Sequence, residues 1–332
     1  MIGCPTNAKN TLDKNYLYLA EKKGVKVFPE TEAFLIRDDG AGRFTVQAKS
    51  PGWGSLIQAQ GTFSANKVIV AAGTIGTIRL LLNSKVRYRT LPKISDRLGE
   101  GVKTNSEVLT GVSRSDYVMD YSKGVAIASS VTLDRETTVE AVRYPAGSEF
   151  MGLLAGPRVW GRSPLARIYH FLLQAIANPR LLGLVRPFGF ATRGFVLLFM
   201  QTSRNGLDLI LRRRFGFGPL TLTTRIRANT RPPATLPVAT AFTEAVAKEI
   251  GGRGGSYVTE LIGMSFTAHI LGGCKFGTSA ANGVIDDNHE VFGHPGLFVV
   301  GGAAVPANLG ANPALTITAM AERMVAKFPN RK

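Results

Sequence analysis

Two segments near the C-terminus place residues that could do chemistry beside glycines that let a ligand approach the backbone. Residues 267–274 (TAHILGGC) put His269 shortly before a glycine pair, and residues 298–324 (FVVGGAAVPANLGANPALTITAMAERM) put Asn312 before a run of helix-forming residues. Imidazole is suited to acid–base chemistry at neutral pH, and glycine allows close backbone approach. A single histidine in such a segment is, however, more often structural than catalytic.

The second segment predicts a strand, a glycine-rich loop and a helix. Asn312 is a good N-cap residue and Pro313 suits the first helical position, so we expect the helix to begin there and continue to Arg323. The unpaired N–H groups and the positive end of the dipole of such a helix attract anions. A well-capped helix packed on a sheet accounts for the pattern equally well.

An earlier segment predicts a second glycine-containing turn. Residues 68–73 (VIVAAG) read as a strand buried on both faces, and a helix is expected from Gly73 to Ser84. In doubly wound folds such a turn brings backbone N–H groups to a ligand at the carboxyl edge of the sheet. The alternative is a simple tight turn, because the pattern is GxxG and no GxGxxG motif follows a strand in this chain.

The remaining elements follow from apolar periodicity. A short helix is expected over 11–22 and strands over 25–28, 33–37, 44–48 and 56–63. Between 105 and 261, strands over 124–133, 138–143, 195–201, 207–212 and 220–225 predict an antiparallel sheet, followed by a helix over 237–248. Residues 158–193 are both apolar and basic, which fits either an amphipathic lid or a helical hairpin on the sheet.

Composition excludes several classes of protein. The 332 residues are 45% hydrophobic and carry a net charge of +17, which suits anionic partners, but no nucleic-acid motif accompanies the charge. Two cysteines, Cys4 and Cys274, exclude a disulfide framework, and the Cys and His residues predict no metal site. No signal peptide or membrane-spanning run is evident, so we expect a cytoplasmic protein with peripheral membrane contact as one option.

Four segments together resemble a known family. VIVAAGTIGTIRLLL, LPKISDRLGEGVKTN, HILGGCKFG and LFVVGGAAVPANLGANPALTITAMAER are similar to glucose-methanol-choline (GMC) oxidoreductases, and within them to the cholesterol oxidase-like branch. The resemblance implies a mixed α/β and α+β fold. Residues 1–104 and 262–332 would form part of a doubly wound FAD-binding domain, and residues 105–261 a substrate-binding domain built on an antiparallel sheet. The family's GxGxxG segment would lie upstream of Met1.

The resemblance also implies a reaction and its residues. In such enzymes an alcohol hydroxyl loses its proton and the carbinol carbon passes a hydride to N5 of FAD. His269 matches the family's histidine that assists deprotonation, and Asn312 its asparagine beside the flavin. Glu140 matches the carboxylate with which sterol oxidases move a 5-ene double bond to the 4-ene position. An exposed strand glutamate near Arg143 is the alternative for Glu140.

Cofactor contacts are expected, by the same resemblance, in both outer parts of the chain. They comprise Gly73, Asn105, Gly301, Gly302, Asn312, Pro313 and Ala314. Two positions depart from the family pattern, because Ile270 replaces a proline after the histidine and Gly301 replaces an aspartate beside the cofactor.

Three functions are therefore open. The first is oxidation of a bulky hydrophobic alcohol, with a 3β-hydroxysterol as the expected substrate and its 3-ketone as the product. The second is an inactive fragment of such an enzyme, which the missing GxGxxG motif and Gly301 favour. The third is a basic module that binds membrane surfaces, which the +17 charge and residues 158–193 favour.

Overall fold

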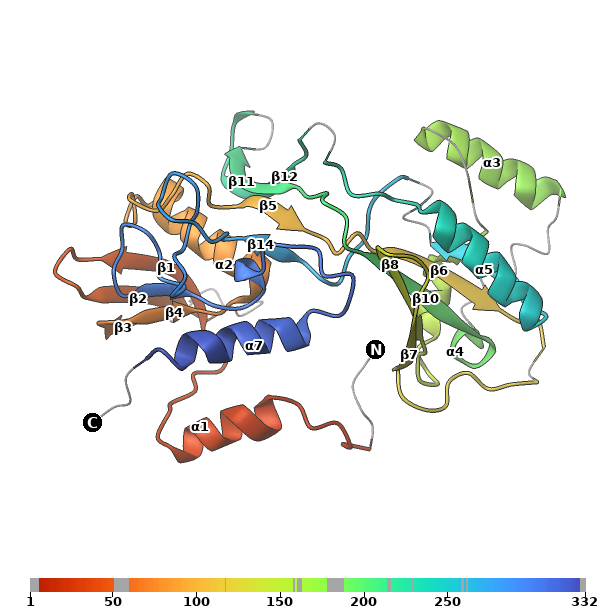
Figure 1. Cartoon of the computed structure of the whole chain (residues 1–332), viewed down its shortest axis with the longest axis horizontal. Helices are drawn as coiled ribbons and strands as arrows, with labels where there is room; N and C mark the ends of the chain where they lie inside the picture. Colours follow the sequence, from red (N-terminus) through yellow and green to blue (C-terminus); the bar gives the residue numbers. More distant parts are fainter. Residues whose placement is uncertain are drawn as a thin grey trace.

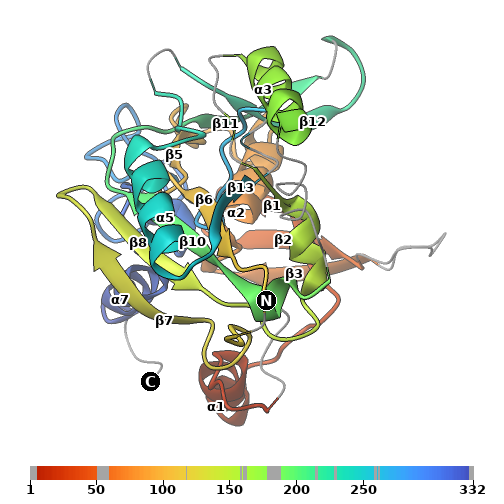
Figure 2. The same cartoon turned by 90° about the vertical axis from the view of Figure 1, so that its right-hand side faces the viewer.

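The computed structural model contains two lobes that lie side by side along the long axis of the molecule (Figure 1). It describes residues 6–50, 60–116, 118–157, 159, 163–177, 188–213, 216–227, 230–257, 260 and 262–328. One lobe contains β1 to β4, α2 and α7, and the other contains a six-stranded sheet with α5. Figure 2 views the molecule from the side of the six-stranded sheet.

The strands form five sheets in the described part of the chain. A three-stranded antiparallel sheet has the order β1 (Glu32–Asp38), β2 (Phe44–Lys49), β3 (Gln60–Ala65). The six-stranded sheet has the order β7 (Ile127–Thr132), β8 (Thr137–Val142), β10 (Gly194–Gln201), β6 (Val108–Ser113), β13 (Arg253–Tyr257), β9 (Ala155–Gly156). Three pairs complete the set: β11 (Asp208–Arg213) with β12 (Leu220–Arg225), β5 (Glu100–Lys103) with β14 (Leu271–Gly273), and β4 (Val68–Val70) with β15 (Leu297–Val299).

The helices are short and connect or cover these sheets. The α-helices are α1 (Tyr18–Lys22), α2 (Gly73–Leu82), α3 (Pro164–Ala177), α4 (Phe190–Arg193), α5 (Pro237–Glu249) and α7 (Ala314–Val325). π-Helical turns over Asp13–Leu17 and Asn83–Arg87 precede α1 and follow α2, and 3₁₀ turns cover Glu149–Leu154 and Gly302–Ala304.

The first lobe joins segments from both ends of the sequence. β4 and β15 pair in parallel, with Val70 opposite Val299, and β5 pairs with β14. Their core includes Ile78, Leu81, Ile285 and Leu297, all fully buried. The prediction that β4 is buried on both faces is wrong, because Ile69 remains 47% exposed. α7 packs on the neighbouring Phe298 and leaves Ile69 uncovered.

The second lobe confirms the predicted antiparallel sheet. β10 is its most buried strand and pairs with β8 on one side and β6 on the other, both antiparallel. Apolar side chains therefore cover both faces of β10. One face packs against α5 through Leu197, Phe199 and Ala239, while the other carries a second cluster that includes Leu198 and Met200.

Three other expectations need correction or completion. Residues 25–28 do not form a strand; Val25 and Phe28 are more than half exposed and no described strand pairs with them. The predicted strand over 56–63 is β3, and its first residues lie outside the described part of the chain. The β11–β12 hairpin packs through Leu209 on the core of the first lobe, although its residues fall within the range predicted for the substrate domain.

α3 stands at the outer edge of the molecule in both views (Figures 1 and 2). Of the predicted stretch 158–193, the structure describes this helix, α4 and a few flanking residues. Among the described residues no helix combines the length and the apolar character that crossing a bilayer requires.

Candidate active site

Glu140 and Asn312, which are 172 residues apart in the chain, face each other. The side-chain amide of Asn312 donates to both carboxylate oxygens of Glu140 at 2.9 Å. Glu140 lies on β8 and is 7% exposed, so the alternative of an exposed strand glutamate is wrong. Asn312 does not cap the last helix as predicted; α7 begins at Ala314 and Pro313 occupies the cap position. The NH₂ group of Asn312 instead donates to the carboxylate.

His269 pairs with the carboxylate of Glu107, a residue outside the predicted site. Its ring Nδ1 contacts one oxygen of Glu107, whose side chain is only 1% exposed. The other Glu107 oxygen accepts the backbone N–H of Ala268 at 2.7 Å, and the N–H of His269 donates to the hydroxyl of Thr267 at 2.9 Å. The histidine is thus held through both its ring and its backbone. The only signal in the sequence is an acidic residue just before an apolar strand.

Asn105 links the segment that carries Glu107 to the loop that carries Asn312. It is fully buried, with a φ of 57°, two residues before Glu107. Its side-chain oxygen accepts the N–H groups of Leu309 and Gly310 at 2.9 Å, and its amide donates to the carbonyl of Ala311 at 2.9 Å. The expected cofactor contact of Asn105 stays a prediction, since these bonds direct the side chain at the loop that carries Asn312.

The two pairs lie near the same part of the six-stranded sheet. Glu107 directly precedes β6, Glu140 lies on β8, and β10 separates these two strands. Two strand spacings place the backbones of β6 and β8 about 10 Å apart. Asn105 holds the 309–311 loop near the start of β6. Asn312, the next residue of that loop, extends from there to Glu140 on β8. A molecule of moderate size could contact both pairs.

The expected cofactor glycines lie at the carboxyl edge of the β4–β15 pair. Gly73 follows β4 with a φ of 63°, and Gly301 follows β15 with a φ of 107°. A Cβ atom at either position would meet nothing within 4 Å, so both backbones border open space. The start of α7 at Ala314, which follows Gly301 in the chain, is exposed and adds N–H groups that have no partner within the helix. This edge fits the approach of an anionic or dinucleotide cofactor.

Gly302 is different from its neighbour. A Cβ atom there would lie 2.9 Å from the hydroxyl of Thr74, which itself donates to the carbonyl of Ile270 at 2.6 Å. The absence of a side chain at Gly302 therefore lets the start of α2 pack against the segment that leads to β14. Its expected cofactor contact stays a prediction.

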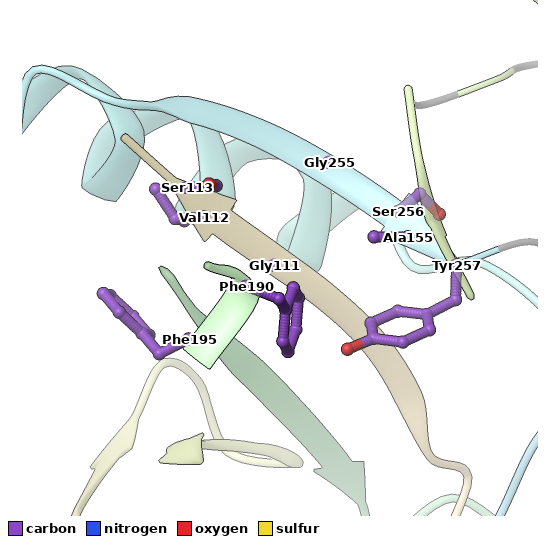
Figure 3. A pocket seen from close by; sticks show the side chains of 9 residues that line it. All are labelled: Gly111, Val112, Ser113, Ala155, Phe190, Phe195, Gly255, Ser256 and Tyr257. Carbon is purple, nitrogen blue, oxygen red and sulfur yellow. The ribbon is translucent and has the colours of Figure 1, made fainter. Parts of the chain in front are cut away.

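An apolar cluster lies on the same face of the sheet as Glu140. Leu198 is directly opposite Glu140 in the β8–β10 register and belongs to a cluster with Val142, Met200 and Tyr257. Figure 3 shows a pocket that Phe190 and Tyr257 of this cluster help to line, with the Tyr257 hydroxyl pointing into it. Burial raises the pKa of this phenol, and the hydroxyl has no hydrogen-bond partner among the described residues.

Metal and thiol chemistry find little support. No group of three or more His, Cys, Asp or Glu side chains comes together as a metal site within the described ranges. Burial raises the pKa of the Cys274 thiol to about 12, so this cysteine is a packed core residue rather than a nucleophile. Cys4 lies outside the described residues.

Sequence comparisons identify relatives of this chain. The profile of the GMC oxidoreductase family matches residues 227–321. A cholesterol oxidase of Acinetobacter baumannii is 39% identical over 99% of this chain and 60% of its own length. A cholesterol oxidase of Mycobacterium tuberculosis (strain ATCC 25618 / H37Rv) is 38% identical over 100% of this chain and 58% of its own length. The chain thus spans about three fifths of the curated relatives it matches.

Solved structures share the fold. A pyridoxine 4-oxidase from Mesorbium loti superposes with a TM-score of 0.58 at 13% identity, over 97% of this chain and 62% of that one. An FAD-dependent oxidoreductase from Chaetomium thermophilum gives a TM-score of 0.54 at 15% identity, over 95% and 63%. The chain is thus similar in sequence to GMC oxidoreductases and shares the fold of these two oxidoreductase structures.

Proposed function

We propose that this chain supplies the substrate domain and the catalytic side chains of an FAD-dependent oxidoreductase. Its substrate is a bulky hydrophobic alcohol, a 3β-hydroxysterol that becomes the 3-ketone. The observations that carry the proposal are two side-chain pairs, His269 with Glu107 and Asn312 with Glu140, and the bonds by which Asn105 ties the segment before Glu107 to the loop before Asn312. The identity of 38–39% to cholesterol oxidases supports the substrate class.

Each of the three side chains has a separate role. Bound FAD would accept the hydride of the carbinol carbon. His269 takes the proton of the substrate hydroxyl, directly or through water. Asn312 orients the oxygen of the substrate and holds the Glu140 carboxylate by its amide. Glu140, which lies opposite Leu198 of the apolar cluster, carries a proton between ring carbons in the 5-ene to 4-ene isomerisation.

The chain order supports the proposed division into domains. Residues 1–104 and 262–332 would form the cofactor-binding part, because the β4–β15 and β5–β14 pairs join these two ranges. Residues 105–261 would form the substrate-binding part, since they contain all strands of the six-stranded sheet. Gly73, Gly301 and the start of α7 would hold the cofactor at the edge of the first part.

Single-residue variants in flavin-loaded protein test the roles. His269→Asn should lower kcat for cholesterol oxidation about 10²–10⁴-fold, the usual contribution of a general base. Glu140→Gln should leave oxidation in place while the 5-ene-3-one accumulates, which chromatography of the products measures. Full turnover of His269→Asn, or 4-ene-3-one formation by Glu140→Gln at the normal rate, contradicts the respective role.

Flavin binding separates the enzyme from an inactive fragment. We expect protein extended by the family's upstream GxGxxG segment to purify yellow, with flavin absorbance in proportion to protein. A colourless extended protein would favour the inactive fragment.

A second candidate function, peripheral membrane binding, is favoured by α3. Its apolar residues recur at helical spacing and face solvent: Leu165, Ile168, Tyr169, Leu172, Leu173 and Ile176, which are 38–79% exposed. The polar face turns to the protein, where Arg167 donates to the carbonyl of Glu260 at 3.3 Å. A surface helix of a water-soluble protein shows the reverse orientation. We propose that α3 lays its apolar face on a lipid surface.

The positive charge of the chain indicates lipids with anionic headgroups. The chain has a net charge of +17, and the sequence flanking α3 contains Arg158, Arg162, Arg180 and Arg186. Anionic headgroups attract such segments by about 1 kcal/mol per basic residue near the surface. The proposed surface is therefore an anionic membrane, which would also be a source of a hydrophobic alcohol.

Vesicle sedimentation tests this proposal. The protein should pellet with vesicles that contain phosphatidylserine and much less with phosphatidylcholine alone. Leu172→Glu should weaken binding about tenfold or more, because burying a leucine contributes about 2 kcal/mol. Val125→Glu is the matched control, since Val125 is 64% exposed but far from α3 in the chain. Equal loss with both variants, or none with Leu172→Glu, contradicts docking through α3.

A further inference from the structure

The buried carboxylate of Glu107 has two fixed contacts. One oxygen accepts the Ala268 N–H at 2.7 Å and the other contacts Nδ1 of His269. No lysine or arginine forms an ion pair with Glu107 within the described ranges, so the histidine ring is its principal side-chain partner. Nδ1 is itself buried, and the exposed 16% of the His269 side chain therefore lies on its other atoms.

This arrangement fixes which ring nitrogen carries the proton. An ionised carboxylate offers only acceptors, so Nδ1 must be the donor in this pair. In a neutral imidazole the second nitrogen, Nε2, is then an unprotonated acceptor. Serine hydrolases use a buried aspartate in the same way to orient their histidine base.

We propose that Glu107 is a positioning residue that holds His269 in the Nδ1–H tautomer, which leaves Nε2 as the base for the substrate hydroxyl. The part that concerns the hydroxyl rests on the proposed function, whereas the tautomer does not. Glu107 needs no contact with substrate or cofactor for this role, since it acts through the imidazole.

Glu107→Gln gives a distinctive prediction because the Ala268 N–H is a backbone donor that cannot be reversed. Glutamine has one acceptor oxygen, which this N–H requires, so its NH₂ group would face Nδ1. Nδ1 must then accept, and the ring proton moves to Nε2. The near-isosteric substitution preserves packing but removes the basic nitrogen from the substrate side.

Nitrogen NMR of ¹⁵N-histidine-labelled protein measures this directly. The chain has four histidines, and His269→Gln identifies the His269 signals by their loss. We expect Nδ1 of His269 to give the protonated-type shift and Nε2 the unprotonated-type shift, and Glu107→Gln to exchange the two. Unchanged His269 shifts in Glu107→Gln would overturn the proposal.

A second carboxylate–histidine pair provides the control. His294 Nδ1 contacts Asp38 at 2.7 Å, in the first lobe and away from the site. Asp38→Asn should change the shifts of His294 and leave those of His269 as in the unsubstituted protein. If Asp38→Asn altered His269 to the same extent as Glu107→Gln, the effect would be general and the proposal wrong.

Turnover of flavin-loaded protein separates this inference from the proposed function. Glu107→Gln should lower kcat for cholesterol about 10²–10⁴-fold with little change in KM, because substrate contacts are retained. An exchanged tautomer with normal turnover supports the role of Glu107 and refutes His269 as base. A retained tautomer refutes the role of Glu107 whatever the turnover.

Discussion

Replacing Asn105 by alanine should strongly destabilise the chain. The side chain is fully buried and makes three hydrogen bonds to the backbone of residues 309–311. Alanine removes all of them and leaves two N–H groups and one carbonyl without these partners. Alanine also tolerates the φ of 57° at this position less well than asparagine.

The expected magnitude follows from these contacts. Each lost bond costs about 1 kcal/mol net, and the left-handed backbone adds about 1 kcal/mol for alanine. The free energy of unfolding should fall by about 4 kcal/mol in Asn105→Ala. Asn105→Gly removes the same bonds without the backbone cost, so its loss should be about 3 kcal/mol.

Urea titration followed by circular dichroism measures these free energies. Asn105→Asp is the matched variant that keeps an oxygen for the Leu309 and Gly310 N–H groups but sets a second acceptor against the Ala311 carbonyl, so it isolates the contribution of the NH₂ donor. A loss below 1 kcal/mol in Asn105→Ala, or an alanine variant more stable than the glycine variant, would refute the reasoning.

Three further predictions concern buried groups elsewhere. Burial lowers the pKa of His289 below 6.5, so as pH falls through 6.5 the unfolded chain binds a proton that the folded chain does not. The urea concentration at the unfolding midpoint should therefore be lower at pH 5 than at pH 7.5. The difference should be smaller in His289→Gln. Iodoacetamide should leave Cys274 unmodified in the native protein and alkylate it in urea, as peptide mass spectrometry measures. Gly302→Ala should lower the free energy of unfolding by about 1–3 kcal/mol, because the new methyl group displaces the Thr74 hydroxyl. Thr74→Ala should then lower it less in the Gly302→Ala protein than in the unsubstituted protein. Additive losses in urea titrations would contradict the contact.

Elements with a strong local pattern could be predicted from the sequence. β10 is a continuous apolar run, α5 begins at a proline, and β12 lies over the residues expected. In contrast, β13 (RGGSY) contains two glycines, which local propensity disfavours in a strand. It forms because β6 and β9 pair with it on either side, a property of the tertiary structure alone.

The candidate site was only partly predictable for the same reason. Resemblance identified His269, Asn312 and Glu140, and the structure brings the last two together at 2.9 Å. Their roles stay predictions. Glu107 could not be recognised, because its partner is 162 positions away in the chain and an acidic residue before a strand is usually exposed. The helix start was misplaced because a buried carboxylate competes for the Asn312 side chain that local rules assign to capping.

The parallel pairing of β4 with β15 bears on how this chain folds in the cell. The partners are separated by 229 residues, from Val68 to Leu297. At about 5–20 residues per second, a ribosome needs roughly 10–50 s to deliver β15 after β4 has been made. During that time β4 lacks this neighbour, and the nascent first lobe presents an open strand edge to chaperones or to other chains. The six-stranded sheet, whose last strand ends at Tyr257, can form before β15 is made. The first lobe, which needs both β4 and β15, would then be completed after the second.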